Sequence, residues 1–374
     1  MKRLNISQVD TLFANGGYPI EFLLYYANGV KTAGIRAALR ELSTPYWPMF
    51  GEYRRGQIVS EGYREEASFD AEVSSGEFDP AEPNQAILGR YGHVIPRNMK
   101  KLFFLKVIQY TNGTVLLARL NHVAGDGYSY VSFLSALAEM VRHHPGSVPE
   151  QKDSFFPEPH HQRTLLRDFE LGELALEPLG DTGGSAVVFL EVPKASVREQ
   201  IQRIAADRDH RVSTNDILAA MVVKRLAAVE DGPVGDDFQL TVPIDVRRAI
   251  PEFGPRYFGN GLMFGRIPFR RSEVRDASLD TIAIDIRKGM PDVSRENYVT
   301  YLEELESLIR TRQTHRLRTY DPRSGCLVTN LSRLPTDRLD FGSGTPDTVL
   351  PLTVGKNSGA VLGDGDRFVL RMEH

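Results

Sequence analysis

Two apolar runs with an Asn-Gly pair between them constrain this chain more than any other local feature. The runs are Phe103–Tyr110 and Val115–His122, and Thr111-Asn112-Gly113-Thr114 lies between them. An Asn-Gly turn between such runs is the strongest short-range signal for a β-hairpin. A loop, Gly125-Asp126-Gly127, then leads into a helical pattern with apolar residues on one face, namely Val131, Leu134, Ala138 and Val141. The sequence therefore predicts two antiparallel strands, the second ending at His122, followed by a loop and a helix.

The rest of the chain divides into two segments that mix helix and strand signals. Proline and glycine accumulate between about residues 151 and 184, where the periodic patterns weaken. A chain of 374 residues also exceeds the usual size of one hydrophobic core. We therefore expect an α/β protein with a domain over 1–150, a crossover over 151–184 and a domain over 185–374. Helices are predicted at 31–42, 195–207, 214–229 and 295–312, strands at 186–192, 238–244 and 262–268, and a hairpin turn at Gly363-Asp364-Gly365.

Composition excludes several classes of protein. The net charge of −4 argues against a nucleic-acid-binding face, and no apolar run approaches the roughly 20 residues that span a bilayer. The single cysteine, Cys326, excludes an internal disulfide, and the first residues lack the apolar stretch of a signal peptide. Paired histidines such as His160-His161 lack further ligands at suitable spacing, so no metal site is expected. We expect a cytoplasmic, monomeric protein without nucleic-acid or membrane partners.

The segment from His122 to Gly127 is the candidate catalytic site. A histidine suits general base chemistry near neutral pH, because its ordinary pKa lies near 6.5. Asp126 lies on the following loop and is expected to support the site through a buried ion pair, and Gly127 allows close approach of a substrate. A histidine at a strand end is also a common structural residue. The residues alone leave both interpretations open.

Several segments together resemble one family in the right order. His122-Val-Ala-Gly-Asp126-Gly127 matches the H-x-x-x-D-G pattern of the CoA-dependent acyltransferase superfamily, which includes BAHD acyltransferases and the condensation domains of peptide synthetases. Asp340-Phe341-Gly342-Ser343-Gly344 resembles the second BAHD signature, D-F-G-W-G. Further similar segments are Tyr46–Gly51, Val212–Ala220, Pro243–Arg248, Tyr257-Phe258-Gly259-Asn260 and Val328–Pro335. Five or more ordered matches are far more specific than one.

The resemblance implies a fold and a reaction. The fold would be two pseudo-symmetric chloramphenicol-acetyltransferase-like domains, with mixed, largely antiparallel sheets, helices and a central tunnel. His122 would take the proton from a hydroxyl or amine of a small-molecule acceptor as it attacks an acyl thioester. The thioester, acyl-CoA or a phosphopantetheine arm of an acyl carrier protein, would be a co-substrate, with no permanently bound cofactor. Asp126 would pair with Arg247, and Asp340 and Gly342 would support the structure.

Some positions depart from the family pattern or stay open. Ser343 replaces the tryptophan of the second signature, and Asn121 stands where condensation domains usually carry another histidine. Candidate contacts to the substrate or oxyanion are Asn260, Asn330, Ser343 and the backbone N–H of Gly127. One rival hypothesis is a condensation or cyclisation on a carrier-bound intermediate. The other is a non-catalytic docking domain that retains the fold.

Overall fold

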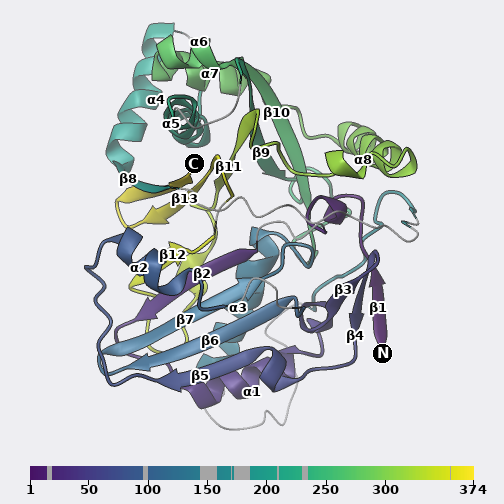
Figure 1. Cartoon of the computed structure of the whole chain (residues 1–374), viewed down its shortest axis with the longest axis vertical. Coiled ribbons are helices and arrows are strands. Elements are labelled where there is room, and N and C mark those ends of the chain that lie inside the picture. The colour runs from purple at the N-terminus through teal and green to yellow at the C-terminus, as the bar shows by residue number, and fades with distance from the viewer. Residues whose placement is uncertain are drawn as a thin grey trace.

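The computed structural model describes residues 1–14, 19–95, 100–143, 158–169, 171, 186–208, 210–229, 235–353 and 355–374. Two large β-sheets organise these residues, one above the other in Figure 1. Most of the predicted crossover over 151–184 lies outside the described residues. Among the described helices, none is long and apolar enough to cross a bilayer.

The lower sheet has the strand order β12-β2-β7-β6-β5. Its strands are β2 (Ile20–Tyr26), β5 (Phe69–Val73), β6 (Phe103–Tyr110), β7 (Gly113–Leu120) and β12 (Thr348–Pro351), and only the β5–β6 pair is parallel. The predicted hairpin is confirmed, with Tyr110 opposite Gly113 and Thr111-Asn112 at the turn.

Helices cover both faces of this sheet, which explains the continuous apolar sequence of β7. On β7, Leu116, Ala118 and Leu120 belong to one buried cluster and Val115 and Leu117 to another. Successive strand side chains point to opposite faces, so a strand buried on both sides needs no polar alternation. The covering helices are α1 (Thr32–Leu42) and α3 (Gly127–His143) on one side and α2 (Asn84–Tyr91) on the other.

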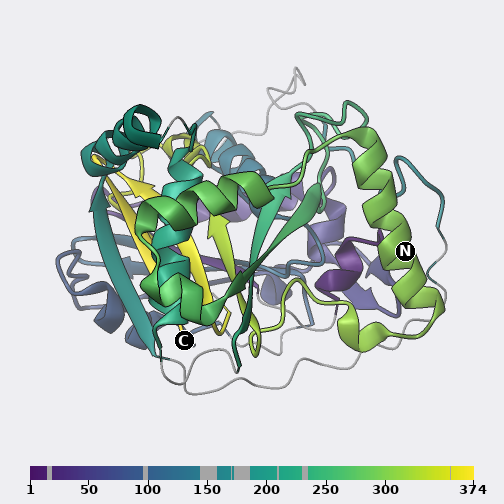
Figure 2. The same cartoon turned by 90° about the horizontal axis from the view of Figure 1, so that it is seen from above.

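The upper sheet has the order β10-β9-β11-β13-β14-β8 and is antiparallel except where β11 pairs with β9 and β13. Helices lie over its outer face, as the view from above in Figure 2 shows. Its strands are β8 (Val187–Pro193), β9 (Asp237–Asp245), β10 (Leu262–Arg270), β11 (Gly325–Asn330), β13 (Ser358–Asp364) and β14 (Arg367–Glu373). The helices are α4 (Lys194–Arg208), α5 (Thr214–Ala227), α6 (Arg271–Asp276) and α7 (Leu279–Gly289).

Two elements of the second half join the first half. Strand β12 pairs with β2 at the edge of the lower sheet. Helix α8 (Arg295–Arg310) buries Tyr298, Leu302 and Leu305 in the same apolar cluster as α1 and α3. A third sheet, of β1 (Lys2–Asn5), β4 (Gln57–Ser60) and β3 (Glu52–Arg54), lies beside them, and 3₁₀ turns occupy Asp10–Leu12, Trp47–Phe50, Glu65–Ala67, Thr314–Arg316 and Thr336–Arg338. Sheet membership therefore does not follow the predicted domain ranges at every point.

The predicted fold class, mixed α/β with largely antiparallel sheets, is confirmed. Element boundaries differ from the predictions by only a few residues; the predicted helix over 295–312, for example, ends at Arg310. The turn of the last hairpin lies further along the chain than predicted. Asp364 pairs with Arg367, so the turn is Gly365-Asp366 rather than Gly363–Gly365. Gly365 has a φ of 51°, the positive value that a tight hairpin turn requires.

Candidate active site

His122 lies on the loop between β7 and α3. The strand ends at Leu120 and the helix begins at Gly127, so residues 121–126 form the connection. Asn121 shapes this loop, because its side-chain oxygen accepts the N–H of Val123 at 3.1 Å and its carbonyl accepts the N–H of Ala124 at 2.9 Å. The local signals that predicted a strand, a loop and a helix therefore place the histidine where the sheet meets the helix.

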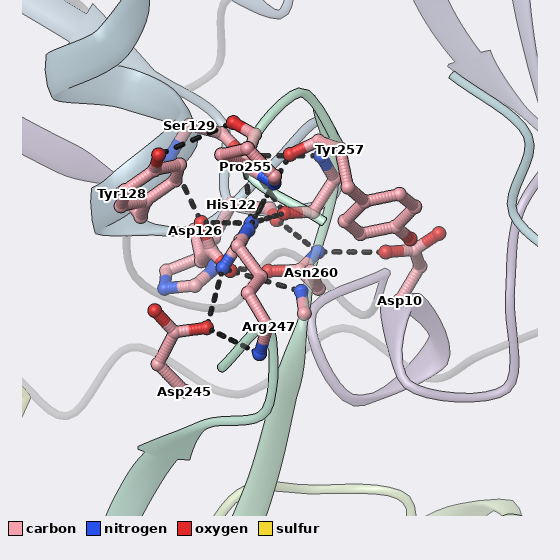
Figure 3. A network of polar contacts seen from close by, with 12 residues as sticks. Asp10, His122, Asp126, Tyr128, Ser129, Asp245, Arg247, Pro255, Tyr257 and Asn260 are labelled. Carbon is pink, nitrogen blue, oxygen red and sulfur yellow. Dashed lines mark hydrogen bonds and ion pairs between the residues drawn. The ribbon is translucent and has the colours of Figure 1, made fainter. Parts of the chain in front are cut away.

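The imidazole of His122 is held on one face and at one nitrogen. The ring of Phe13 stacks on it, with centroids 3.7 Å apart and planes 8° from parallel. Its Nδ1 lies 3.1 Å from Oδ1 of Asn260, as Figure 3 shows. The residue as a whole is only partly buried. The contacts orient the ring without enclosing the residue completely.

The contacts of Asn260 determine which ring nitrogen carries the proton. Its amide nitrogen lies 2.7 Å from Oδ1 of Asp10 and 2.8 Å from the backbone carbonyl of His122. Both partners only accept hydrogen bonds, so the NH₂ group must face them and the amide oxygen must face the ring. Nδ1 of His122 then donates to that oxygen, and Nε2 carries the free lone pair. That is the tautomer a general base needs.

Burial lowers the pKa of His122 below its ordinary value of 6.5, because an imidazolium loses hydration there. The negative charge of Asp126, a backbone hydrogen bond at His122 itself, the hydrogen bond to Asn260 and the charge of Asp10 act in the opposite direction without cancelling the effect. The ring is therefore neutral at pH 7 and able to accept a proton.

The predicted ion pair between Asp126 and Arg247 is present. Nη1 of Arg247 lies 2.9 Å from Oδ2 of Asp126, and Nη2 lies 3.0 Å from Oδ1. The backbone N–H groups of Ser129 and Gly261 donate to the same carboxylate at 3.0 and 2.9 Å. Burial alone would raise the pKa of Asp126, but the charge of Arg247 and these hydrogen bonds lower it overall.

Arg247 also connects the two halves of the chain. It follows β9, and its guanidinium donates to Asp245 and to the carbonyl of Gly259, both at 3.0 Å. It lies over the ring of Tyr128, 4.6 Å from the centroid, in the first turn of α3. Because Asp126 immediately precedes α3, this one side chain attaches the loop that carries His122 to the second half.

Asn260 lies against the ring of His122. The sequence proposed it as a contact to substrate or oxyanion. Both of its N–H groups are already used, by Asp10 and by the carbonyl of His122. Both N–H groups are therefore occupied in this arrangement, and the amide oxygen contacts the imidazole of His122.

The second signature lies away from His122. Asp340 accepts the N–H groups of Gly342 and Gly344 at 2.8 and 2.9 Å and lies 3.6 Å from Arg142, in the last turn of α3. Helix α3 has 17 residues, which makes it roughly 25 Å long. His122 precedes its other end. Ser343, whose carbonyl accepts from Asn28, is therefore not brought to His122.

The two other oxyanion candidates lie on separate elements. Gly127 is the first residue of α3, and a Cβ added there would lie 3.4 Å from Leu331 and 3.6 Å from Leu334. Asn330 ends β11, and its amide nitrogen lies 3.1 Å from Asn215. The loop after β11 therefore packs at the start of α3.

Sequence reasoning missed Phe13, Asp10 and Arg163. Ser7 and Asp10 form a reciprocal pair of hydrogen bonds, and the S-x-x-D spacing was a visible helix-start signal. That signal does not reveal the contact to Asn260. Arg163 lies within the predicted crossover, yet its buried guanidinium donates to the carbonyl of Ala124 at 2.7 Å. In the described ranges, no group of three or more histidine, cysteine or acidic side chains could hold a metal ion.

Comparisons with known proteins identify the family of the chain. A family model described as "Transferase family" matches residues 2–366. The chain is 24% identical over 373 residues to shikimate O-hydroxycinnamoyltransferase of Nicotiana tabacum, covering 90% of this chain and 80% of that protein. It is 25% identical over 374 residues, with the same coverage, to a hydroxycinnamoyl-CoA:5-hydroxyanthranilate N-hydroxycinnamoyltransferase of Avena sativa.

The fold is also shared with solved structures. F. graminearum TRI101, complexed with coenzyme A and deoxynivalenol, superposes with a TM-score of 0.70 at 13% identity, covering 100% of this chain and 95% of that one. The family match confirms the predicted acyltransferase superfamily and the use of an acyl thioester as co-substrate. This chain belongs to the Transferase family, the CoA-dependent acyltransferases that act on hydroxyl or amine acceptors.

Proposed function

We propose that Nε2 of His122 is the general base of an acyl transfer from acyl-CoA to a small-molecule acceptor. The observation that carries this proposal is the hydrogen bond at Nδ1, which leaves Nε2 as the free lone pair. Nε2 removes the proton of the acceptor O–H or N–H while the acceptor oxygen or nitrogen attacks the thioester carbonyl. The tetrahedral oxyanion collapses, the carbon–sulfur bond breaks, and the imidazolium returns the proton to the leaving thiolate.

The geometry supports direct transfer without an acyl-enzyme. A thioester is already activated, and holding both substrates together supplies much of the rate enhancement. Cys326 is fully buried, which raises the pKa of its thiol and removes it as a nucleophile. We propose that both substrates reach His122 through a tunnel between the domains over 1–150 and 185–374, joined by the crossover over 151–184.

The remaining site residues are proposed as support and as oxyanion donors. Asp126, Gly127 and Arg247 hold the catalytic loop, and Asp340 and Gly342 hold the far end of α3. Asn330 keeps one N–H beyond its bond to Asn215, and this N–H or that of Gly127 is proposed to stabilise the oxyanion.

The acceptor is proposed to be a hydroxyl- or amine-bearing product of specialised metabolism. Two of the relatives are named for O- and N-hydroxycinnamoyl transfer, which supports this class. We propose free acyl-CoA rather than a carrier-bound thioester as the donor, because these relatives are named or described as CoA enzymes. A monomer in the cytoplasm is proposed on the composition of the chain.

Thiol release tests the proposal. Wild type and His122→Ala are compared in Ellman's assay with a panel of acyl-CoAs and hydroxyl or amine acceptors. His93→Ala, at an exposed position, is the matched control. Acceptor-dependent thiol release by wild type and His93→Ala, with a loss of about 10²–10⁴-fold in His122→Ala, supports the base.

Three outcomes contradict it. Unchanged thiol release in His122→Ala would exclude the histidine as the base. Release only from an acylated carrier protein would favour the rival condensation or cyclisation, and no release from any thioester would favour a docking domain.

A further inference from the structure

Asp10 lies behind the catalytic histidine although it is 250 positions from its partner Asn260. Its side chain is fully buried. Oδ1 accepts the amide of Asn260 at 2.7 Å, and Oδ2 accepts the backbone N–H of Ser7 at 2.8 Å. Asp10 does not touch the ring of His122 in Figure 3, because Asn260 lies between them.

The orientation of Asp10 is fixed independently of His122. The hydroxyl of Ser7 accepts the N–H of Asp10 at 3.1 Å, which closes a reciprocal pair at the start of the first 3₁₀ turn. Nε of Arg163 lies 3.7 Å from Oδ2, and this guanidinium is itself 1% exposed. A buried carboxylate needs such a cation and such donors to stay charged.

Asp10 and the backbone carbonyl of His122 together fix the direction of the Asn260 amide. A carboxylate only accepts hydrogen bonds, so Asn260 must turn its NH₂ group toward Asp10 and its oxygen toward His122. We propose that Asp10 is a positioning residue that acts through Asn260 to keep the proton on Nδ1 and leave Nε2 free. The inference rests on the proposed function of His122, and Asp10 takes no part in proton transfer.

Asp10→Asn is the informative substitution because it keeps the shape of the side chain and can replace the acceptor that faces Asn260 with an N–H donor. If the new amide oxygen keeps the N–H of Ser7, its NH₂ group faces Asn260. Asn260 then rotates, presents NH₂ to Nδ1 of His122, and favours the tautomer protonated at Nε2. The backbone carbonyl of His122, which accepts from the Asn260 amide in the native structure, opposes this rotation, so the Nε2-protonated tautomer is expected to rise without fully replacing the native one.

The tautomer is measured by NMR on the full chain with ¹⁵N-labelled histidine, at a pH where the ring is neutral. The His122→Gln spectrum assigns the signals of His122. Wild type is expected to show a protonated Nδ1 and an unprotonated Nε2. In Asp10→Asn the Nε2-protonated form is expected to rise, and kcat is expected to fall in proportion to the remaining fraction of the Nδ1-protonated form, with little change in KM.

Asp216→Asn is the matched control. Asp216 is also a buried carboxylate and pairs with an arginine, Arg287, but it caps α5 in the upper half. This variant is expected to lose stability while kcat and the His122 signals stay as in wild type. If Asp10→Asn does not fold, Asn260→Ala removes the amide oxygen directly and is expected to raise the same Nε2-protonated form.

Two results would overturn the inference. One is wild-type kcat in folded Asp10→Asn. The other is a loss of kcat while Nδ1 stays fully protonated, which would reduce Asp10 to a packing role. The NMR experiment measures the His122 tautomer in the absence of substrates. A failure of this inference is therefore distinguishable from a failure of the proposed function, which His122→Ala tests by thiol release.

Discussion

Arg247 and Asp126 form a two-point ion pair across 121 positions of the chain, with N–O distances of 2.9 and 3.0 Å. Their side chains are 3% and 2% exposed. The pair lies beside the loop that carries His122 and joins the start of α3 to the segment after β9. We expect its role to be structural.

Removing Asp126 is expected to destabilise the protein strongly. Asp126→Ala leaves the Arg247 charge buried without its main partner, which costs about 3–5 kcal/mol in the free energy of unfolding. Asp245→Ala is the matched control, because Asp245 contacts the same guanidinium but is 41% exposed, so its loss should cost at most about 1 kcal/mol. Urea denaturation of both variants measures the difference. Equal losses would contradict the structural role of Asp126.

The pH–rate profile is expected to show its acidic inflection below pH 6.5. Burial lowers the pKa of His122, so the neutral base persists to a more acidic pH than an exposed histidine would allow. The same shift means that the unfolded chain binds this proton first, so stability falls as the pH drops below about 6.5 toward the folded pKa. Measuring kcat/KM from neutral to acidic pH gives the pKa of His122 in the free enzyme. An inflection above the ordinary histidine pKa would contradict the burial effect.

Removing the ring that stacks on His122 is expected to slow turnover. Phe13→Ala gives the imidazole freedom to leave its productive orientation, and an aromatic contact of this kind is worth about a two- to tenfold change in rate. Phe78→Ala is the control, because Phe78 is equally apolar and buried but packs on Tyr25 on the other face of the lower sheet. Only Phe13→Ala should lower kcat in the folded enzyme. Similar kcat values in both variants would show that the stacking has no catalytic role.

The second signature is expected to affect stability and not the reaction. Asp340→Ala removes the acceptor for two exposed backbone N–H groups, which costs about 0.5–1.5 kcal/mol in the free energy of unfolding. The kcat and KM of the folded variant should stay at wild-type values, because Asp340 contacts the last turn of α3 and His122 precedes the first. Thermal unfolding and steady-state kinetics check both statements. A raised KM would instead indicate that the loop contacts a substrate.

Local sequence signals predicted the parts of the fold that depend on neighbouring residues. The hairpin from Phe103, the loop at His122 and the helix with Val131 and Leu134 follow from turn chemistry and apolar periodicity, which act over a few positions. The pairing of Asp126 with Arg247 was predicted only through the family resemblance. Nothing in the spacing of those two residues indicates that they meet.

Only the tertiary structure decided which distant side chains surround the ring of His122. Phe13, Asp10 and Asn260 meet at His122 because the first 3₁₀ turn and the segment before β10 pack against one loop. Likewise, β12 joins the lower sheet although it belongs to the last part of the chain. Local conformational preferences do not record such contacts, because burial and charge pairing between remote segments depend on the path of the whole chain. The sequence by itself determined the position of His122 and its loop. The tertiary structure determined which nitrogen of the His122 ring carries the proton.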